Sequence, residues 1–319
     1  MKKRHAIAMT VLAAVAASGL AVSSAAAQTK LSIGYSGWTG FAPLYLAKEA
    51  GIFEKNGLDV TMKKIPQSSR HLALASGDIQ CAATTVETWI SWNASGIAAT
   101  QIFQMDKSYG ADGMVVRNDI KSIKDLKGKT VAAWSPGTAP FFGLSWYLKK
   151  NGLSVKDVKI VNLDPSAAAQ AFLAGQNDAA MTYEPYLSSV RAKPDAGKII
   201  ATTLDYPMVM DTFGCTPKFF ADNPAAGKAL AKSYFEALAM IKSDQAKSYE
   251  IMGKDVKQTG AEFGDSAKYL RWQDKAANEK FFASEFPAFN KEAAELLLET
   301  GVIKAIPDLS KLADTKFIQ

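Results

Sequence analysis

Histidine and cysteine are scarce in this chain: its 319 residues include two of each. His5 lies within the first 27 residues, so His71 is the one histidine in the rest of the sequence. A multi-histidine zinc site is therefore excluded, no metal site is predicted, and a Ser-His-Asp triad would depend on His71. Because His71 follows Arg70 in a helical stretch, we interpret it as an ordinary polar helix residue rather than a catalytic one.

Long apolar runs are missing after residue 27, and no later stretch approaches the roughly 20 apolar residues of a membrane span. Residues 1–27 have a basic start, an apolar stretch over 6–22 and small residues up to Ala27. This order is typical of a secretory signal peptide that is cleaved after Ala27. A membrane anchor is less favoured, because the apolar stretch is Ala-rich and ends in an Ala-x-Ala pattern. We therefore expect a soluble, exported protein.

Acidic residues are absent from the same segment, so its three basic residues supply half of the formal net charge of +6. The remaining net charge of +3 is too small for a dedicated nucleic-acid surface. The composition, with 48% hydrophobic, 21% charged and 10% aromatic residues, excludes disorder, collagen and coiled coil. The length fits two domains or two lobes, because single cores stop growing near roughly 250 residues.

Short β-rich runs alternate with helical patterns from residue 28 onward, which is typical of an α/β fold with mostly parallel sheets. Strands are expected over residues 31–36, 58–65, 79–84, 98–104 and 113–117, and helices over 42–50, 68–75 and 87–94. A polar connector over 117–129 follows, which we interpret as a lobe boundary. The alternation then restarts with strands over 130–134, 158–163, 179–182 and 198–202, and the chain after 224 is mostly helical.

Small and polar loops connect strands to helices in both predicted lobes. In open sheets, ligands bind at the carboxyl ends of the strands, and exposed amides at helix N-termini attract anions and polar groups. Two lobes whose loops face each other therefore predict a ligand cleft. The first such loop, residues 36–43, combines two glycines with the rigid apolar faces of Trp38 and Phe41.

Five sequence segments occur in an order that resembles one known family. They are IGYSGWTGFAPLYLAKEAGIFEKNGLDV at 33–60, LASGDIQ at 74–80, IKDLKGKTVA at 123–132, FLAGQNDAA at 172–180 and YEPYL at 183–187. Each is weak alone, but together they extend over most of the chain after the signal peptide. In this order they resemble periplasmic substrate-binding proteins of the nitrate/sulfonate/taurine type.

The resemblance implies a periplasmic binding protein-like type II fold, with two α/β lobes and a ligand cleft between them. Lobe I would comprise residues 28–117 and 213–319, including the C-terminal helices, and lobe II residues 118–212. It further implies a monomeric, non-catalytic solute-binding component of an ABC importer, without a cofactor, that delivers its solute to an inner-membrane permease and its ATPase. Cys81 and Cys215 would then lie on neighbouring strands, which leaves a disulfide and two buried thiols both open.

Matching of loops to the family implies a set of ligand-binding positions. They are Trp38, Thr39, Gly40, Ser68, Ser69, Thr85 and Glu87 in lobe I, Ser135, Thr138, Tyr183 and Glu184 in lobe II, and Asp211 where the chain returns. Two of the acids have structural alternatives, because Glu184 could cap the next helix or hold the hinge and Glu87 could be an ordinary first-turn acid. Asp211 falls where taurine-type members place an acid, which favours contact with the solute.

The acids and aromatic residues among these positions suit a cationic nitrogen, because carboxylates pair with it and aromatic faces attract it. None of the loops is rich in Arg or Lys, as a site for a plain anion would be. We therefore expect an amine, a guanidinium-like solute or an aminosulfonate. The alternatives are an alkanesulfonate, nitrate, a pyrimidine-type thiamine precursor and a sensory role; an enzyme of the related pyrimidine-synthase class is less favoured, since the mature chain has one histidine.

Overall fold

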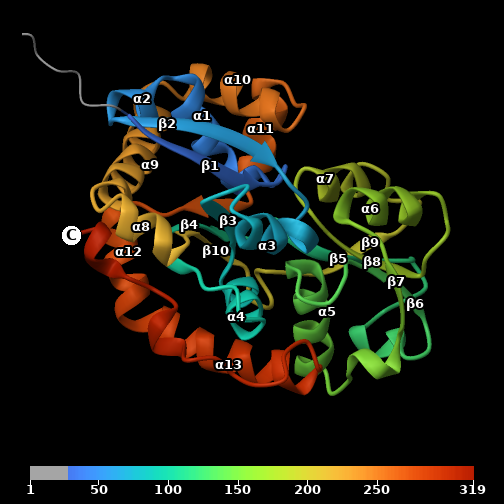
Figure 1. Cartoon of the computed structure of the whole chain (residues 1–319). Helices are drawn as coiled ribbons and strands as arrows, with labels where there is room; N and C mark the ends of the chain where they lie inside the picture. Colours follow the sequence, from blue (N-terminus) through green and yellow to red (C-terminus); the bar gives the residue numbers. More distant parts are fainter. Residues whose placement is uncertain (1–27) are drawn as a thin grey trace, which may run out of the picture.

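Two sheets with helices packed around them form the molecule (Figure 1). The computed structural model describes residues 28–319, so the segment predicted to be a signal peptide, residues 1–27, lies outside the described residues. Among the helices of residues 28–319, none combines the length and apolar character that crossing a lipid bilayer requires.

The first sheet has six strands in the order β11-β4-β10-β3-β1-β2. Their bounds are β1 Thr29–Tyr35, β2 Leu58–Lys64, β3 Cys81–Thr85, β4 Thr100–Ser108, β10 Met210–Cys215 and β11 Leu270–Trp272. β1 pairs in parallel with β2 and β3, whereas β10 runs antiparallel between β3 and β4. A strand from late in the sequence is therefore inserted between two early ones.

Eight helices within residues 28–319 belong to this lobe. They are α1 Ala42–Glu49, α2 Ile52–Lys55, α3 Gln67–Ser76, α4 Val86–Ala94, α8 Pro217–Asp222, α9 Ala226–Ser243, α10 Gln245–Asp255 and α11 Gly260–Ala267. Among them, α10 packs on α1, α9 and α11 rather than on the sheet. As expected, α3 ends at a glycine in the left-handed region, Gly77 with φ of 80°. In the core beneath α9, Phe103 stacks on Phe213 and on Tyr234 with ring centroids 5.0 and 4.9 Å apart.

The second sheet has five strands in the order β7-β6-β8-β5-β9. Its strands are β5 Asp112–Val116, β6 Thr130–Ala133, β7 Lys159–Asn162, β8 Ala179–Tyr183 and β9 Lys198–Thr202, and its helices are α5 Ala139–Lys150, α6 Pro165–Leu173 and α7 Tyr186–Arg191. The parallel β7-β6-β8 part matches the expected α/β pattern, and β5 pairs antiparallel with β8 and β9.

The position of β5 corrects the expected lobe boundary. Placing residues 113–117 at the end of lobe I is wrong, because β5 belongs to the second sheet. The chain changes sheets at residues 109–111, and the polar connector after residue 117 lies between β5 and β6. The sequence did not show whether β5 belongs to the first or the second sheet, because β4 and β5 are both buried strands. The three residues between them are too few to show a change in composition at the crossing.

The two segments that cross between the lobes are bonded to each other. The hydroxyls of Ser108 and Thr203 lie 2.6 Å apart, and the Gly110 amide donates to Thr203 Oγ1 at 2.9 Å. The Thr203 amide donates to the carbonyl of Asp112 at 3.1 Å. Short adjacent crossings of this kind are suited to act as a hinge.

The C-terminal helices contact both lobes. α12 (Lys275–Lys280) is held on β4 by Asn278, which accepts from the Gln104 amide at 2.6 Å and donates to its carbonyl at 2.9 Å. A π-helical turn (Phe281–Glu285) leads into α13 (Phe286–Glu299), which runs beneath α4 and α5 in Figure 1. Phe289 packs there on Phe142 and Trp146 of α5. The sequence had suggested that residues 213–319 all belong to lobe I. The segment after α12 instead packs on both lobes.

Cys81 and Cys215 form a disulfide bond between β3 and β10. They lie opposite each other in the antiparallel register, and both are fully buried. Of the two alternatives left open by the sequence, the structure selects the bridge.

Candidate functional site

A small cavity lies between the lobes, at the carboxyl ends of β1 and β3. Its lining residues are Ser36, Trp38, Phe41, Gln67, Arg70, Thr85, Asp112, Ala139, Tyr183, Val209 and Asp211. The volume of about 20 Å³ has room for about one water molecule. Because both lobes line it, they must separate before a solute can enter.

Four of the residues proposed from the sequence meet at this cavity: Trp38, Thr85, Tyr183 and Asp211. They come from four separate segments of the chain. The indole of Trp38 and the ring of Tyr183 form an edge-to-face pair across the lobes, with centroids 5.3 Å apart. One wall of the cavity is therefore aromatic and is completed only when the lobes are together.

Thr39 and Gly40 lie behind the cavity rather than in its lining. Thr39 is buried, and the Gly40 carbonyl accepts from Nε1 of Trp272 at 3.1 Å. A Cβ atom on Gly40 would lie 2.2 Å from Oδ2 of Asp106 and 2.2 Å from Nε1 of Trp38. Only glycine therefore lets the backbone pack directly on this carboxyl group.

At the N-terminus of α3, the residue that enters the cavity is Gln67, whereas Ser68 and Ser69 are partly exposed and outside the lining. Gln67 Nε2 donates to Oγ1 of Thr84 at 2.8 Å, and Gln67 Oε1 accepts from the Ala139 amide of α5 at 3.1 Å. This side chain links lobe I to lobe II directly. Loop matching had led to this loop, and the structure brings Gln67 rather than Ser68 or Ser69 to the cavity.

Glu87, in the first turn of α4, lies beside the cavity with its carboxyl group buried. Oε1 accepts hydrogen bonds from the hydroxyls of Thr85 and Thr88, and Oε2 has no partner within residues 28–319. Burial raises the pKa of Glu87 to about 7. This carboxyl group is therefore poised between its protonated and ionised forms at neutral pH.

In lobe II, Thr138 is the N-cap residue of α5, and its hydroxyl donates to the Ser135 carbonyl at 2.8 Å. Neither side chain lines the cavity. Their contribution is to shape the start of α5, whose first residue, Ala139, reaches the lining.

Glu184 is fully buried, but it faces α7 instead of the cavity. Its carboxylate accepts from Arg191 Nη1 at 2.8 Å and from the Ser188 amide at 3.0 Å. Arg191 in turn lies over the ring of Tyr269 in the other lobe, 4.2 Å from its centroid. These contacts match the structural alternative for Glu184, which caps the following helix and supports a contact between the lobes.

Arg70 lines the cavity and was not selected from the sequence. The side chain is fully buried and donates to the carbonyls of Ile65 and Ala83. Burial lowers the pKa of Arg70 to about 10, so the guanidinium stays protonated at neutral pH. Arg70 thus places a positive charge at the edge of the cavity.

Two further acids, Asp106 and Asp112, were also missed. Burial raises the pKa of Asp112 to about 7. Burial and the neighbouring Asp106 carboxyl group raise the pKa of Asp211 well above its ordinary value. Together with Glu87, four buried carboxyl groups therefore surround a cavity to which Arg70 contributes the one guanidinium. Such a cluster favours a cationic group as a partner.

His71 does not line this cavity. The His71 ring lies against Trp92, with centroids 6.2 Å apart. In the portion of the chain from residue 28 to 319, no group of three or more His, Cys, Asp or Glu side chains is arranged to hold a metal ion.

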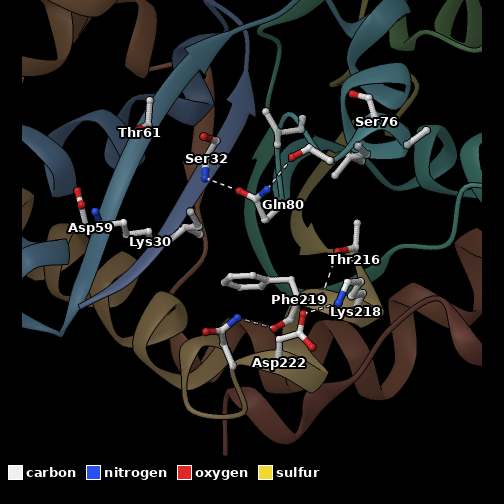
Figure 2. A pocket seen from close by; sticks show the side chains of 16 residues that line it. Lys30, Ser32, Asp59, Thr61, Ser76, Gln80, Thr216, Lys218, Phe219 and Asp222 are labelled. Carbon is white, nitrogen blue, oxygen red and sulfur yellow. Dashed lines mark hydrogen bonds and ion pairs between the residues drawn. The ribbon is translucent and has the colours of Figure 1, made fainter. Parts of the chain in front are cut away.

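A larger cavity, of about 680 Å³, lies elsewhere in lobe I (Figure 2). It lies at the amino ends of β1 and β3, the end of the sheet where open α/β folds do not bind ligands. Gln80 at its centre is already bonded to the Ser32 amide and the Gly77 carbonyl, both at 2.8 Å, and Lys218 is paired with Asp222. We therefore place the functional site at the smaller cavity between the lobes.

Comparison with solved structures identifies the fold. The alkanesulfonate-binding protein SsuA of Xanthomonas axonopodis pv. citri, solved with MOPS, superposes with a TM-score of 0.76 at 19% identity, covering 91% of this chain and 100% of that protein. The periplasmic aliphatic sulphonate binding protein SsuA of Escherichia coli gives a TM-score of 0.74 at 21% identity, covering 90% and 92% of the two chains. The fold is therefore that of the periplasmic binding proteins, as expected.

Residues 24–252 match the model of the NMT1-like family, and this chain belongs to that family. The taurine-binding periplasmic protein of Escherichia coli strain K12 is 25% identical over 300 residues, which cover 88% of this chain and 91% of that relative. The resemblance drawn from the five sequence segments is confirmed, and these named relatives are binding proteins.

Proposed function

We propose that this protein is the solute-binding component of an ABC importer and that it captures a small zwitterionic solute of the aminosulfonate type. It would act as a monomer in the periplasm and present the solute to an inner-membrane permease and its ATPase. Closure of the two lobes around the solute would produce the state that the transporter recognises.

The observation that carries this proposal is the set of buried acids at the cavity. Asp112 and Asp211 line it directly, and Glu87 and Asp106 lie immediately behind. Burying several carboxylates without counter-charge is costly, and an ammonium group would supply that charge on binding. The aromatic pair of Trp38 and Tyr183 adds faces that attract a cation.

A sulfonate group would find its partners on the other side of the same cavity. Arg70 supplies a buried guanidinium, and the N-terminus of the 12-residue helix α5 lies at Ala139. Those two features support an anionic end on the solute. A relative named for taurine, which carries both an ammonium and a sulfonate group, agrees with this division of the cavity.

The second candidate is a simple alkanesulfonate without a nitrogen, in line with the alternative drawn from the sequence. The structural neighbours named for aliphatic sulfonates favour it. Against it stands the charge at the cavity, where a plain anion would face the carboxyl groups of Asp112 and Asp211 as well as Arg70.

Calorimetric titration of the purified protein with matched solutes distinguishes these candidates. Taurine, ethylammonium, ethanesulfonate, guanidinium and nitrate each test one part of the chemistry. We expect the tightest binding with taurine, and for Asp211→Asn a loss of taurine affinity of about tenfold or more, because a charge-assisted hydrogen bond is removed. Binding of ethanesulfonate equal to that of taurine, or unchanged taurine affinity in Asp211→Asn, would refute the assignment of an ammonium partner.

A further inference from the structure

Two buried acids, Asp106 on β4 and Asp211 on β10, face each other directly in the antiparallel register. Their exposed fractions are 0% and 2%. Like charges directly opposite on neighbouring strands are destabilising, and burial in a region of low polarity increases the cost. Oδ2 of each side chain lacks a hydrogen-bond donor in the described part of the chain. One proton shared between the two carboxyl groups would satisfy both and remove the repulsion.

Lobe I by itself produces this arrangement, so it does not depend on closure. β10 and β4 belong to the same sheet, and Asp106 is covered by two neighbours from the loop after β1. Trp38 Nε1 donates to Oδ1 of Asp106 at 3.3 Å, and Gly40 packs against Oδ2. Asp211 lines the cavity whereas Asp106 does not. Asp106 therefore acts on a solute indirectly, through Asp211 and Trp38, which both line the cavity.

The charged and titratable groups around the pair are predominantly acidic. Asp112 on β5 and Glu87 on α4 add negative charge, and the phenol of Tyr234 approaches from α9. Arg70 on α3 supplies positive charge, but it is held by the carbonyls of Ile65 and Ala83. Burial raises the pKa values of both members of the pair. At Asp211 the neighbouring acids add to this effect, and at Asp106 the hydrogen bond from Trp38 opposes it.

We propose that Asp106 and Asp211 hold one proton between them in the solute-free protein and release it to water when an ammonium group binds at Asp211. The inference rests on the proposed function, since it requires a solute with a cationic nitrogen. The exchange balances: the ammonium keeps its own protons, the pair loses one, and the released proton passes to the solvent. Asp106 is thus a positioning residue that sets the protonation of Asp211 without touching the solute.

This exchange makes solute affinity depend on pH in a defined direction. As long as the pair is protonated in the solute-free protein, each binding event releases one proton. The affinity for the solute therefore rises about tenfold for each unit by which the pH rises. Between pH 5.5 and 7.5 the affinity should therefore rise by about 100-fold. Separate carboxylates with ordinary pKa values near 4 would be ionised throughout this range, and the affinity would stay constant.

Taurine titrations from pH 5.5 to 7.5, in buffers of different ionisation enthalpy, measure both the slope and the number of protons released. We expect the wild type to release about one proton more than Asp106→Asn, whose amide can donate to an ionised Asp211. The profile of Asp106→Asn should therefore be flatter, while Asp112, with its pKa of about 7, titrates in both proteins. Asp78→Asn, at an exposed acid of the same lobe, is the matched control and should keep the wild-type slope. A wild type with a flat profile and no proton release would overturn the inference while leaving the proposed function intact.

A measurement without solute tests the shared proton independently of any variant's folding. Carbon-13 NMR of wild-type protein labelled at the aspartate carboxyl carbons should show, besides the signal of Asp112, at least one further signal that titrates above pH 6 in the solute-free state. Absence of such a signal would overturn the inference even if taurine binds. If the signal is present but no amine binds, the proposed function fails and the proton release fails with it.

Discussion

Replacement of Glu87 by glutamine should change the pH dependence of stability, because this carboxyl group is buried with only part of its hydrogen-bonding capacity used. Oε1 accepts from Thr85 and Thr88, and glutamine keeps an acceptor there. Oε2 has no hydrogen-bond partner among residues 28–319, and in glutamine a neutral amide nitrogen takes its place. The two side chains have nearly the same shape, so the comparison isolates the charge.

The direction of the effect follows from the raised pKa. Burial raises the pKa of Glu87 from 4.5 to about 7, so the folded protein keeps a proton that the unfolded chain has already lost. The free energy of unfolding therefore falls as pH rises from about 4.5 to about 7, and the loss is complete above that. The difference corresponds to about 3 kcal/mol. Glutamine does not ionise, so Glu87→Gln escapes this loss.

Differential scanning calorimetry of the solute-free protein at pH 4.5, 6 and 8 measures the effect. Relative to the wild type, Glu87→Gln should gain about 3 kcal/mol between pH 4.5 and 8, or roughly 6–12 °C in Tm. Glu279→Gln, at an exposed glutamate of α12, is the control and should follow the wild type. A Tm difference between Glu87→Gln and wild type that is the same at all three pH values would refute the reasoning.

Two other perturbations test packing and the disulfide. Gly40→Ala should lower the taurine affinity and the Tm, with a loss of about 1–3 kcal/mol in the free energy of unfolding, because the new Cβ would lie 2.2 Å from Asp106 Oδ2. The control Gly37→Ala should be tolerated, because its Cβ would lie 3.7 Å from the Tyr186 hydroxyl. Equal calorimetric behaviour of the two variants would contradict this account. Removal of the disulfide in Cys81→Ala/Cys215→Ala should lower the free energy of unfolding by up to about 5 kcal/mol, since the bridge closes a loop with a sequence separation of 134. Urea unfolding measures this loss, and a urea midpoint equal to that of the oxidised wild type would show that the disulfide contributes little to stability.

Much of the fold could be predicted from local patterns. The alternation of strands and helices indicated two α/β lobes, and glycines such as Gly77 marked the ends of helices. The five family segments identified the right class of protein, which the family match confirmed. These features depend on residues close in sequence, where periodicity and backbone preferences are directly readable.

The candidate site was only partly accessible to the same reasoning. Loop positions led to Trp38, Thr85, Tyr183 and Asp211, which meet at the cavity. In the loop after β2 the same reasoning led to Ser68 and Ser69, whereas the structure brings the longer Gln67 to the cavity, where it accepts from the Ala139 amide. Glu184 was included because of its motif, although its carboxylate is used by Arg191 and Ser188.

Short-range patterns along the chain are enough to predict the class of fold, the order of its elements and the loops that face the cleft. Long-range strand pairing, by contrast, selects which acids act together. Asp106 and Asp211 are far apart in the chain and become direct neighbours only because β10 is inserted beside β4. The same insertion brings Cys81 opposite Cys215 and closes the disulfide. Strand order is set by long-range pairing, and that pairing brings four carboxyl groups around the cavity where a cation is proposed to bind.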